Sequence, residues 1–154
     1  MNEIQLDVNH TQFNLEHTLS SGQTFRWIKQ NGEWNGIIKG RFIQINQIRN
    51  KIIAKIYPGD PNKDEKIIKD YFRLDDDLDH ILETIRLDDE INKAIRRFKG
   101  LRLMNQEPWE CLISYICATN KNIPAIMRNI ELISKMFGAK ITTKDKEHYS
   151  FPTP

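Results

Sequence analysis

Two segments of the sequence carry amides, hydroxyls and positive charge in arrangements that could hydrogen-bond a ligand. They are Ser21-Gly22-Gln23-Thr24-Phe25-Arg26-Trp27 and Thr119-Asn120-Lys121-Asn122. A glycine lets a ligand approach the backbone closely, and an asparagine amide offers both donors and acceptors. The structural alternatives are a turn glycine at Gly22 and a helix N-cap at Asn120 or Asn122. From the residues alone the turn is favoured for Gly22, whereas the asparagines can cap a helix and bind a ligand at once.

Common enzymatic motifs are absent from the sequence. It contains no GxGxxG motif, P-loop, HExxH or CxxC pair, and its four histidines occur singly, which favours surface or structural roles. The run Asp75-Asp76-Asp77 precedes an apolar stripe, so we interpret it as a helix start and not as a metal site. Cys111 and Cys117 lie six positions apart in an apolar run, which predicts two buried free thiols. We therefore expect neither a metal nor a cofactor.

Composition and charge indicate a globular protein. Of the 154 residues, 39% are hydrophobic and 29% are charged, which is typical of one domain or of one small domain and part of a second. The net charge of +2 permits a nucleic-acid partner without arguing for one. All charges from Lys93 to Arg102 are basic, which fits either a phosphate footprint or, the favoured interpretation, a solvated helix face. With no signal peptide or membrane-spanning window, we expect an intracellular, soluble protein.

The first third of the chain is predicted to form antiparallel strands. Residues 24–28 and 34–38 flank Asn31-Gly32, a strong hairpin signal. Residues 42–45 and 52–56 are predicted to pair in a second hairpin with its turn near Asn50. Polar and apolar residues alternate along 42–46, which predicts one packed and one solvated sheet face.

The remainder of the chain has the apolar spacing of helices. We expect five helices, the last two beginning near Pro108 and Asn122, with Gly138 as the final C-cap. Their predicted inward stripes are Ile67, Ile68, Tyr71 and Phe72; Leu78, Ile81, Leu82 and Ile85; Ile91, Ala94, Ile95 and Phe98; Trp109, Leu112, Ile113 and Ile116; and Ile126, Ile130, Ile133 and Phe137. Strands followed by helices predict an α+β fold, with helices packed against an antiparallel sheet.

Six short motifs, in order, give the sequence a resemblance to a known family. They are the Ser21–Trp27 segment, Trp34 to Gly36, Tyr71 to Asp75, Gly100 to Ile123, Phe137-Gly138 and Phe151-Pro152. Their order and spacing resemble the N-terminal half of the 8-oxoguanine DNA glycosylase/AP lyase family from about Leu19 to Pro152. The resemblance implies a TATA-binding-protein-like sheet domain over residues 1–105. It also implies the first helices of an incomplete all-helical helix-hairpin-helix domain over residues 106–154.

The family resemblance implies base-excision repair chemistry. Members flip oxidised guanine out of duplex DNA, and a lysine amine attacks C1′ of the sugar to form a Schiff base. That lysine follows an LPGVG-type hairpin, with an aspartate a short distance beyond, and residues 1–154 contain no such hairpin. We therefore assign no catalytic residue in this chain. We expect it to be a fragment that is inactive in base removal by itself.

The resemblance implies binding roles for a few residues of this chain. Gly22 matches the glycine whose carbonyl accepts a hydrogen bond from N7–H of the oxidised base. Asn120 matches an asparagine that contacts the cytosine opposite the lesion. Apart from the resemblance, the helix N-terminal amides near Asn122, and Lys121 beside Asn120, are candidates for phosphate contacts. Ala125 stands where many relatives have an arginine that reads that cytosine, which predicts a relaxed opposite-base preference.

The expected partner is double-stranded DNA containing oxidised guanine, with the protein as a monomer. The alternative is a non-catalytic DNA-binding or interaction module descended from the same family. Such a module would bind DNA with a strong dependence on salt and would need no further residues.

Overall fold

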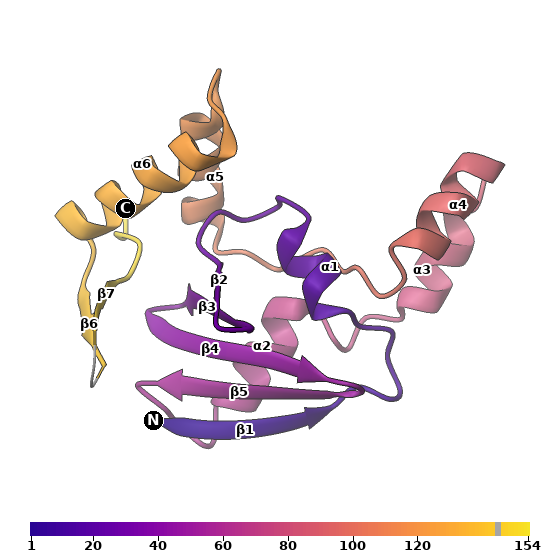
Figure 1. Cartoon of the computed structure of the whole chain (residues 1–154), viewed down its shortest axis with the longest axis horizontal. Helices are drawn as coiled ribbons and strands as arrows, with labels where there is room; N and C mark the ends of the chain where they lie inside the picture. The colour runs from indigo at the N-terminus through magenta and orange to yellow at the C-terminus, as the bar shows by residue number, and fades with distance from the viewer. Residues whose placement is uncertain (144–145) are drawn as a thin grey trace.

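The protein has an α+β fold in the computed structural model, which describes residues 1–143 and 146–154. The strands are β1 (Asn2–Asp7), β2 (Ile28–Gln30), β3 (Glu33–Ile38), β4 (Arg41–Ile48), β5 (Lys51–Tyr57), β6 (Lys140–Thr142) and β7 (Glu147–Tyr149). The helices are α1 (Leu15–Ser20), α2 (Asp64–Phe72), α3 (Leu78–Thr84), α4 (Asp89–Arg97), α5 (Pro108–Ala118) and α6 (Ile123–Phe137). The sheet lies at the centre, with α5 and α6 on one side of α1 and α3 and α4 on the other (Figure 1).

Five strands form an antiparallel sheet in the order β1-β5-β4-β3-β2. Both predicted hairpin turns are confirmed. Asn31 and Gly32 connect β2 to β3 with φ of 51° and 81°, the left-handed values that a two-residue hairpin turn needs. Arg49 and Asn50 connect β4 to β5. Turn chemistry is local, and this explains why the sequence located both turns.

The predicted strand at residues 24–28 is wrong in its position, because β2 begins only at Ile28. Residues 24–27 are irregular, and they turn the Trp27 side chain into the core instead of pairing with a neighbouring strand. The sequence interpretation also missed β1, which pairs with β5 at the sheet edge. Ile4, Leu6 and Val8 alternate with polar residues there, which is the period of a strand and the signal that the interpretation overlooked.

One face of the sheet carries the core. Its buried side chains include Ile43, Ile45, Ile52, Ala54 and Ile56, which pack with Leu15 and Leu19 of α1 and with Ile68 and Phe72 of α2. The opposite face is partly solvated: Glu3 and Gln5 of β1 are exposed, whereas Gln44 and Lys55 are half-buried. There Phe42 stacks on His148 of β7, with ring centroids 3.9 Å apart. Burial lowers the pKa of His148, which favours the neutral ring in this stack.

The helix ends follow their predicted capping signals. Asp77 accepts a hydrogen bond from the amide of His80 at the start of α3, and α5 begins at Pro108 as predicted. Gly138 follows α6, but its φ is −84°, so it is not a left-handed cap. A Cβ at Gly138 would lie 1.8 Å from the Ser150 carbonyl oxygen, so the close approach of Ser150, which follows β7, requires this glycine.

Several predicted inward residues are exposed. In α6, Ile126 and Ile130 are buried, but Phe137 is 68% exposed. No residue of α3 or α4 is buried, so the second and third stripes do not belong to the core. Cys111 is exposed and Cys117 half-buried, which contradicts the predicted burial of both thiols, although both are free. α5 and α6 also expose large apolar side chains, including Leu112, Tyr115, Ile116, Leu132 and Met136.

Within residues 1–143 and 146–154, no helix is both long and apolar enough to cross a membrane.

Candidate functional site

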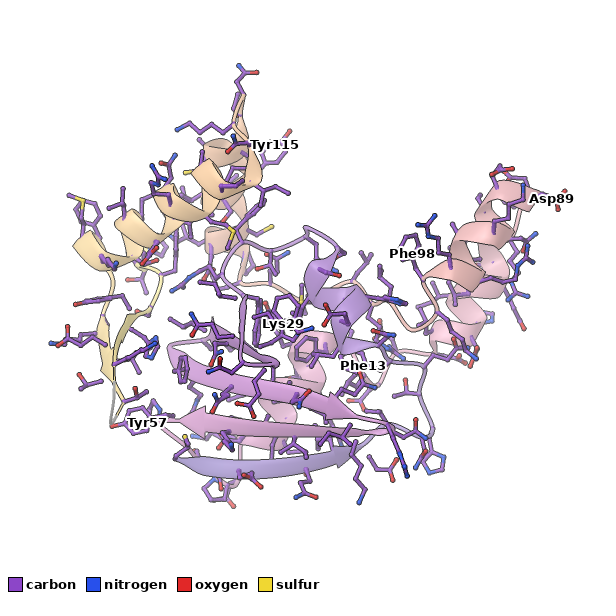
Figure 2. The ribbon with its side chains drawn as sticks, viewed as in Figure 1. Phe13, Lys29, Tyr57, Asp89, Phe98 and Tyr115 are labelled. Carbon is purple, nitrogen blue, oxygen red and sulfur yellow. The ribbon has the colours of Figure 1, made fainter. Side chains whose placement is uncertain are left out.

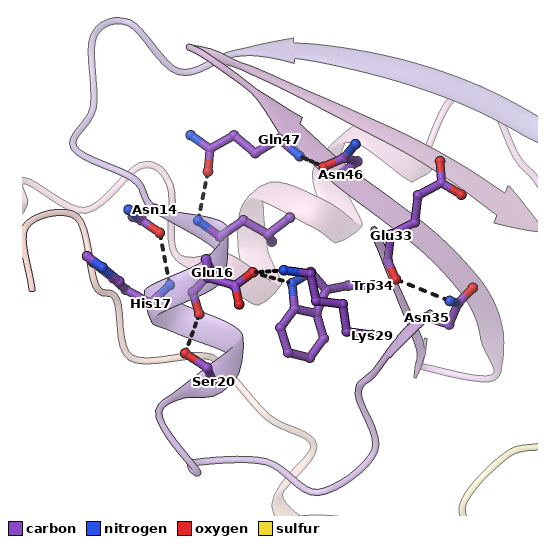
Figure 3. A network of polar contacts seen from close by, with 11 residues as sticks. Asn14, Glu16, His17, Ser20, Lys29, Glu33, Trp34, Asn35, Asn46 and Gln47 are labelled. Carbon is purple, nitrogen blue, oxygen red and sulfur yellow. Dashed lines mark hydrogen bonds and ion pairs between the residues drawn. The ribbon is translucent and has the colours of Figure 1, made fainter. Parts of the chain in front are cut away.

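Helix α1 is fixed to the sheet by polar contacts along its length (Figure 3). Asn14 caps it by accepting a hydrogen bond from the His17 amide at 2.9 Å, and Gln47 accepts one from the Leu15 amide at 2.7 Å. Glu16 accepts hydrogen bonds from Lys29 at 2.7 Å and from the Trp34 indole at 3.2 Å. The hydrogen bond from Lys29 lowers the pKa of Glu16, so this carboxylate stays charged. The segment that follows α1 therefore leaves from a fixed point.

Gln23 ties that segment to the chain that leads into α5. Its side-chain amide donates to the Arg102 carbonyl at 2.9 Å and accepts from the Met104 amide at 2.8 Å. Its backbone carbonyl accepts a hydrogen bond from the Gln106 side chain at 2.6 Å. Three hydrogen bonds thus hold Gln23 against the irregular segment of residues 102–106, about 80 positions further along the chain. A side-chain amide can make such contacts because it has both donors and an acceptor.

Arg102 fixes the segment that leads into α5 through its own side chain. Its side chain is 3% exposed and donates to the carbonyls of Gln12, Arg73 and Asp76, with the Gln12 bond at 2.8 Å, and to the Thr11 hydroxyl. This residue therefore belongs neither to a solvated helix face nor to a phosphate footprint. A planar guanidinium supplies several donors in fixed directions, which suits a cluster of backbone carbonyls.

Arg26 joins the segment to α5. Its guanidinium lies 3.4 Å from the Glu110 carboxylate in the first turn of α5 and also donates to the Tyr149 carbonyl. Burial raises the pKa of Glu110, and the positive charge of Arg26 opposes that shift. The side chains are 9% and 20% exposed, so solvent weakens their attraction only partly.

Trp27 completes the anchoring of the segment. Its indole N–H donates to the Tyr71 hydroxyl at 3.0 Å in the core. Burial raises the pKa of Tyr71 to about 12, so the hydroxyl stays protonated at neutral pH. The six-membered ring of Trp27 lies directly over Gly36, where a Cβ would come within 2.4–2.7 Å of the ring atoms.

Gly22 lies between these anchors and is itself exposed. Its φ is +80°, and a Cβ built there would meet no atom within 4 Å. Its carbonyl oxygen accepts no hydrogen bond from the residues that the structure describes. The structure thus supports the turn interpretation through the backbone conformation, and it also leaves the Gly22 carbonyl without a partner among the described residues.

The turn between α5 and α6 holds the other predicted binding residues. The Asn122 side chain accepts a hydrogen bond from the Ala125 amide at 3.0 Å, so Asn122 is the N-cap of α6. Asn120 has a φ of +55° and does not cap the helix, and its exposed side chain makes no hydrogen bond with the described residues. Lys121 is exposed, and its amide donates to the Ala118 carbonyl.

Gly22 and this turn are connected through α5, and no hydrogen bond joins them directly in the described part of the chain. Arg26 contacts the first turn of α5, and Asn120 follows its last turn, about 16 Å further along an 11-residue helix. Figure 2 shows Tyr115 of α5 pointing outward, away from the sheet. The sequence interpretation gave no positioning role to Gln23, Arg26 or Arg102, because contacts over some 80 positions leave no local signal.

Comparison with known proteins gives one consistent result. Residues 5–112 match the family model "8-oxoguanine DNA glycosylase, N-terminal domain". An N-glycosylase/DNA lyase of Saccharomyces cerevisiae is 32% identical over 97% of this chain and 43% of its own length. The structure of MBOgg1 in complex with a low-affinity DNA ligand aligns with a TM-score of 0.89 and 31% identity, covering 99% of this chain and 52% of that one.

An 8-oxoguanine glycosylase/lyase of Clostridium acetobutylicum is similar in its apo-form, with a TM-score of 0.87 and 29% identity over 99% of this chain and 53% of that one. The same enzyme in complex with double-stranded DNA containing cytosine opposite 8-oxoguanine aligns with a TM-score of 0.83. The chain thus spans about half the length of the proteins it matches. Because the family model covers most of its residues, the chain belongs to the 8-oxoguanine DNA glycosylase family.

Proposed function

We propose that the chain supplies the damage-recognition part of a DNA glycosylase/AP lyase that removes 8-oxoguanine from duplex DNA. The carbonyl of Gly22, which accepts no hydrogen bond from the described residues and lies between the end of α1 and Gln23, is the observation that carries this proposal. The clostridial relative binds duplex DNA containing 8-oxoguanine, which supports the choice of ligand. We further propose a sheet domain over residues 1–105 and the start of a helical domain over 106–154.

The Gly22 carbonyl is proposed to distinguish 8-oxoguanine from guanine at N7. The oxidised base carries N7–H, a donor that the carbonyl can accept, whereas N7 of guanine is itself an acceptor. Two acceptors facing each other in a closed pocket leave both unpaired, at a cost of about 1–3 kcal/mol. That difference corresponds to a preference of about fivefold or more.

The α5–α6 turn is proposed to face the opposite strand. Asn120 presents an unused amide, and the amides at the start of α6, with Lys121, favour a phosphate. No carboxylate occurs between Glu110 and Glu131, so nothing in this stretch repels DNA. Ala125 has no donor for cytosine, and a relaxed opposite-base preference is proposed to follow.

The Schiff-base lysine is proposed to lie outside residues 1–154. A lysine nucleophile needs its pKa lowered, usually by burial, and no lysine among the described residues is buried. The pKa values of Lys69, Lys135 and Lys140 are instead raised, in each case first by a hydrogen bond to a glutamate. Such amines remain protonated at neutral pH and cannot attack C1′.

The lesion-recognition role is tested by measuring duplex affinity with guanine, 8-oxoguanine or 7-deazaguanine at one position opposite cytosine. We expect the chain to bind the 8-oxoguanine duplex about fivefold or more tightly than the guanine duplex. 7-Deazaguanine has no acceptor at position 7, so its duplex should bind more tightly than the guanine duplex. Gly22→Ala should reduce this discrimination, because the added methyl group crowds the base beside the carbonyl.

Gly32→Ala is the matched control for that substitution. Gly32 has nearly the same φ, +81°, and equally open surroundings, but it lies in the β2–β3 turn. Both variants should therefore lose similar stability, and only Gly22→Ala should lose discrimination. Equal discrimination in the two variants would contradict the role of Gly22.

Incubation with an 8-oxoguanine duplex and borohydride tests the location of the nucleophile. Reduction traps any Schiff base between a lysine and the sugar as a covalent adduct. We expect no adduct with residues 1–154, while a full-length relative gives one under the same conditions. A trapped adduct with this chain would show that one of its own lysines is the nucleophile.

A further inference from the structure

A cleft of about 480 Å³ lies between the loop of residues 8–14 and the end of α4, on the side of α1 away from α5. Arg96, Arg97 and Lys99 form one wall. Neutral polar side chains, Asn9, Asn14 and Asn50, together with His10 and His17, line the other. Asp79 is the only carboxylate in the lining, and it accepts a hydrogen bond from Gln12.

In the part of the chain that the structure describes, the three cations of this cleft have no carboxylate partner. None of them takes part in an ion pair among the described residues, whereas Lys93, one turn earlier, is 2.6 Å from Glu90. Arg97 lies over the Phe98 ring at 5.5 Å, which leaves its N–H groups free for an anion. Three unpaired positive charges around one cleft favour a strongly charged anion.

The cationic wall is fixed to the sheet domain. The Asn14 amide donates to the Gly100 carbonyl at 2.8 Å, and the His17 ring lies 3.3 Å from the Lys99 carbonyl oxygen. A Cβ at Gly100 would come within 2.8 Å of the Asn14 nitrogen, so only glycine permits this approach. The His17 ring also meets the edge of Phe98, which Figure 2 shows on the side of α4 nearest α1. These contacts hold residues 98–100 against the start of α1.

The cleft and Gly22 lie at opposite ends of α1. Asn14 and His17 lie at the start of α1, and Gly22 follows the end of the same helix. Asn14 and Gly22 are eight positions apart, with the six-residue helix α1 between them, which corresponds to about 12 Å at the helical rise. Along a duplex, this is the rise of three to four nucleotides of one strand at about 3.4 Å each. For a DNA strand that runs along α1, a phosphate in the cleft would lie three to four nucleotides from the damaged base.

We propose that this cleft binds a backbone phosphate of the damaged duplex, three to four nucleotides from the lesion, through Arg96, Arg97 and Lys99. This inference rests on the DNA-binding function proposed above. Arg96 and Arg97 also lie in the last turn of α4, where the helix dipole favours positive charge. If stabilising α4 were the only role of these cations, their removal would leave the affinity for DNA unchanged.

The test compares the salt dependence of duplex affinity for two triple variants of equal charge. R96Q/R97Q/K99Q removes the cations of the cleft, and K63Q/K66Q/K69Q removes three cations at α2 that are paired with carboxylates. Loss of one phosphate contact should lower the slope of log affinity against log salt by about 0.9. The cleft variant should then lose about threefold less affinity between 50 and 200 mM salt than the wild type. Circular dichroism verifies that both variants are folded.

A neutral methylphosphonate, placed at each position around the lesion in turn, locates the contact. We expect it to weaken binding of the wild type at three to four nucleotides from 8-oxoguanine, and to have no effect there on the cleft variant. Equal slopes for the two triple variants, or no methylphosphonate effect at that distance, would overturn the phosphate site while leaving the role of Gly22 intact. Failure of the wild type to bind any duplex at low salt would overturn both.

Discussion

Arg102→Met should lower the free energy of unfolding by about 3 kcal/mol or more. The buried guanidinium serves the carbonyls of Gln12, Arg73 and Asp76, and methionine fills similar space without a donor. Each buried acceptor left unpaired costs about 1–3 kcal/mol. Because domains of this size have a stability of about 5–15 kcal/mol, the midpoint of urea unfolding should fall markedly while its slope stays constant.

Arg96→Met is the matched control, since Arg96 is an exposed arginine of the same basic run. A surface substitution of this kind changes stability by about 0.5 kcal/mol or less. Similar unfolding midpoints for the two variants would show that the hydrogen bonds of Arg102 are not a main support of the fold. Gln23 donates to the backbone carbonyl of residue 102, and Arg102→Met keeps that acceptor.

Gly36→Ala should cost about 3 kcal/mol. The new methyl group would overlap the Trp27 ring, which cannot move aside because it packs against Tyr71 and Phe72 and hydrogen-bonds Tyr71. Overpacking of a core typically costs about 1–3 kcal/mol, and displacement of Trp27 would also break its hydrogen bond, worth about 1 kcal/mol. Thermal unfolding followed by tryptophan fluorescence measures both the stability and the displaced ring.

Replacing Trp27 by leucine tests whether overlap with its ring causes the loss of stability. In the Trp27→Leu background the overlap disappears, so adding Gly36→Ala should cost little, and the double-mutant cycle should show strong coupling. Asn35→Ala, in the same strand but on the opposite face, should destabilise far less. Additive effects of the Gly36 and Trp27 substitutions would contradict the contact.

The parts of the fold that depend on local chemistry could be predicted from the sequence. Asn31-Gly32 specifies its hairpin through left-handed backbone angles, and Pro108 and Asn122 mark helix starts through the hydrogen bonds of a first turn. Helix α1 was missed because six residues are too few for a periodic stripe. The apolar stripes of α3 and α4 were wrongly predicted to be buried. Helical spacing of apolar residues indicates an amphipathic helix, but it does not indicate which surface the apolar side packs against.

The candidate site could be predicted only where a motif marked it. Gly22 and Asn120 were identified through the resemblance. Their backbone φ values are 80° and 55°. Glycine and asparagine can adopt such values, but their presence in a sequence does not predict them. Gln23 and Arg26 lie in the same motif, yet their roles depend on partners near residues 102–110 and at Tyr149. Such roles follow from tertiary packing, which one sequence does not reveal.

A crystal structure of this chain bound to a duplex with 8-oxoguanine opposite cytosine tests the proposed recognition role most directly. We predict that the Gly22 carbonyl oxygen lies about 2.7–3.2 Å from N7 of the extruded base. We also predict that the α5–α6 turn faces the opposite strand. A base bound elsewhere, or a Gly22 carbonyl that remains in solvent, would contradict the assignment of damage recognition to this segment.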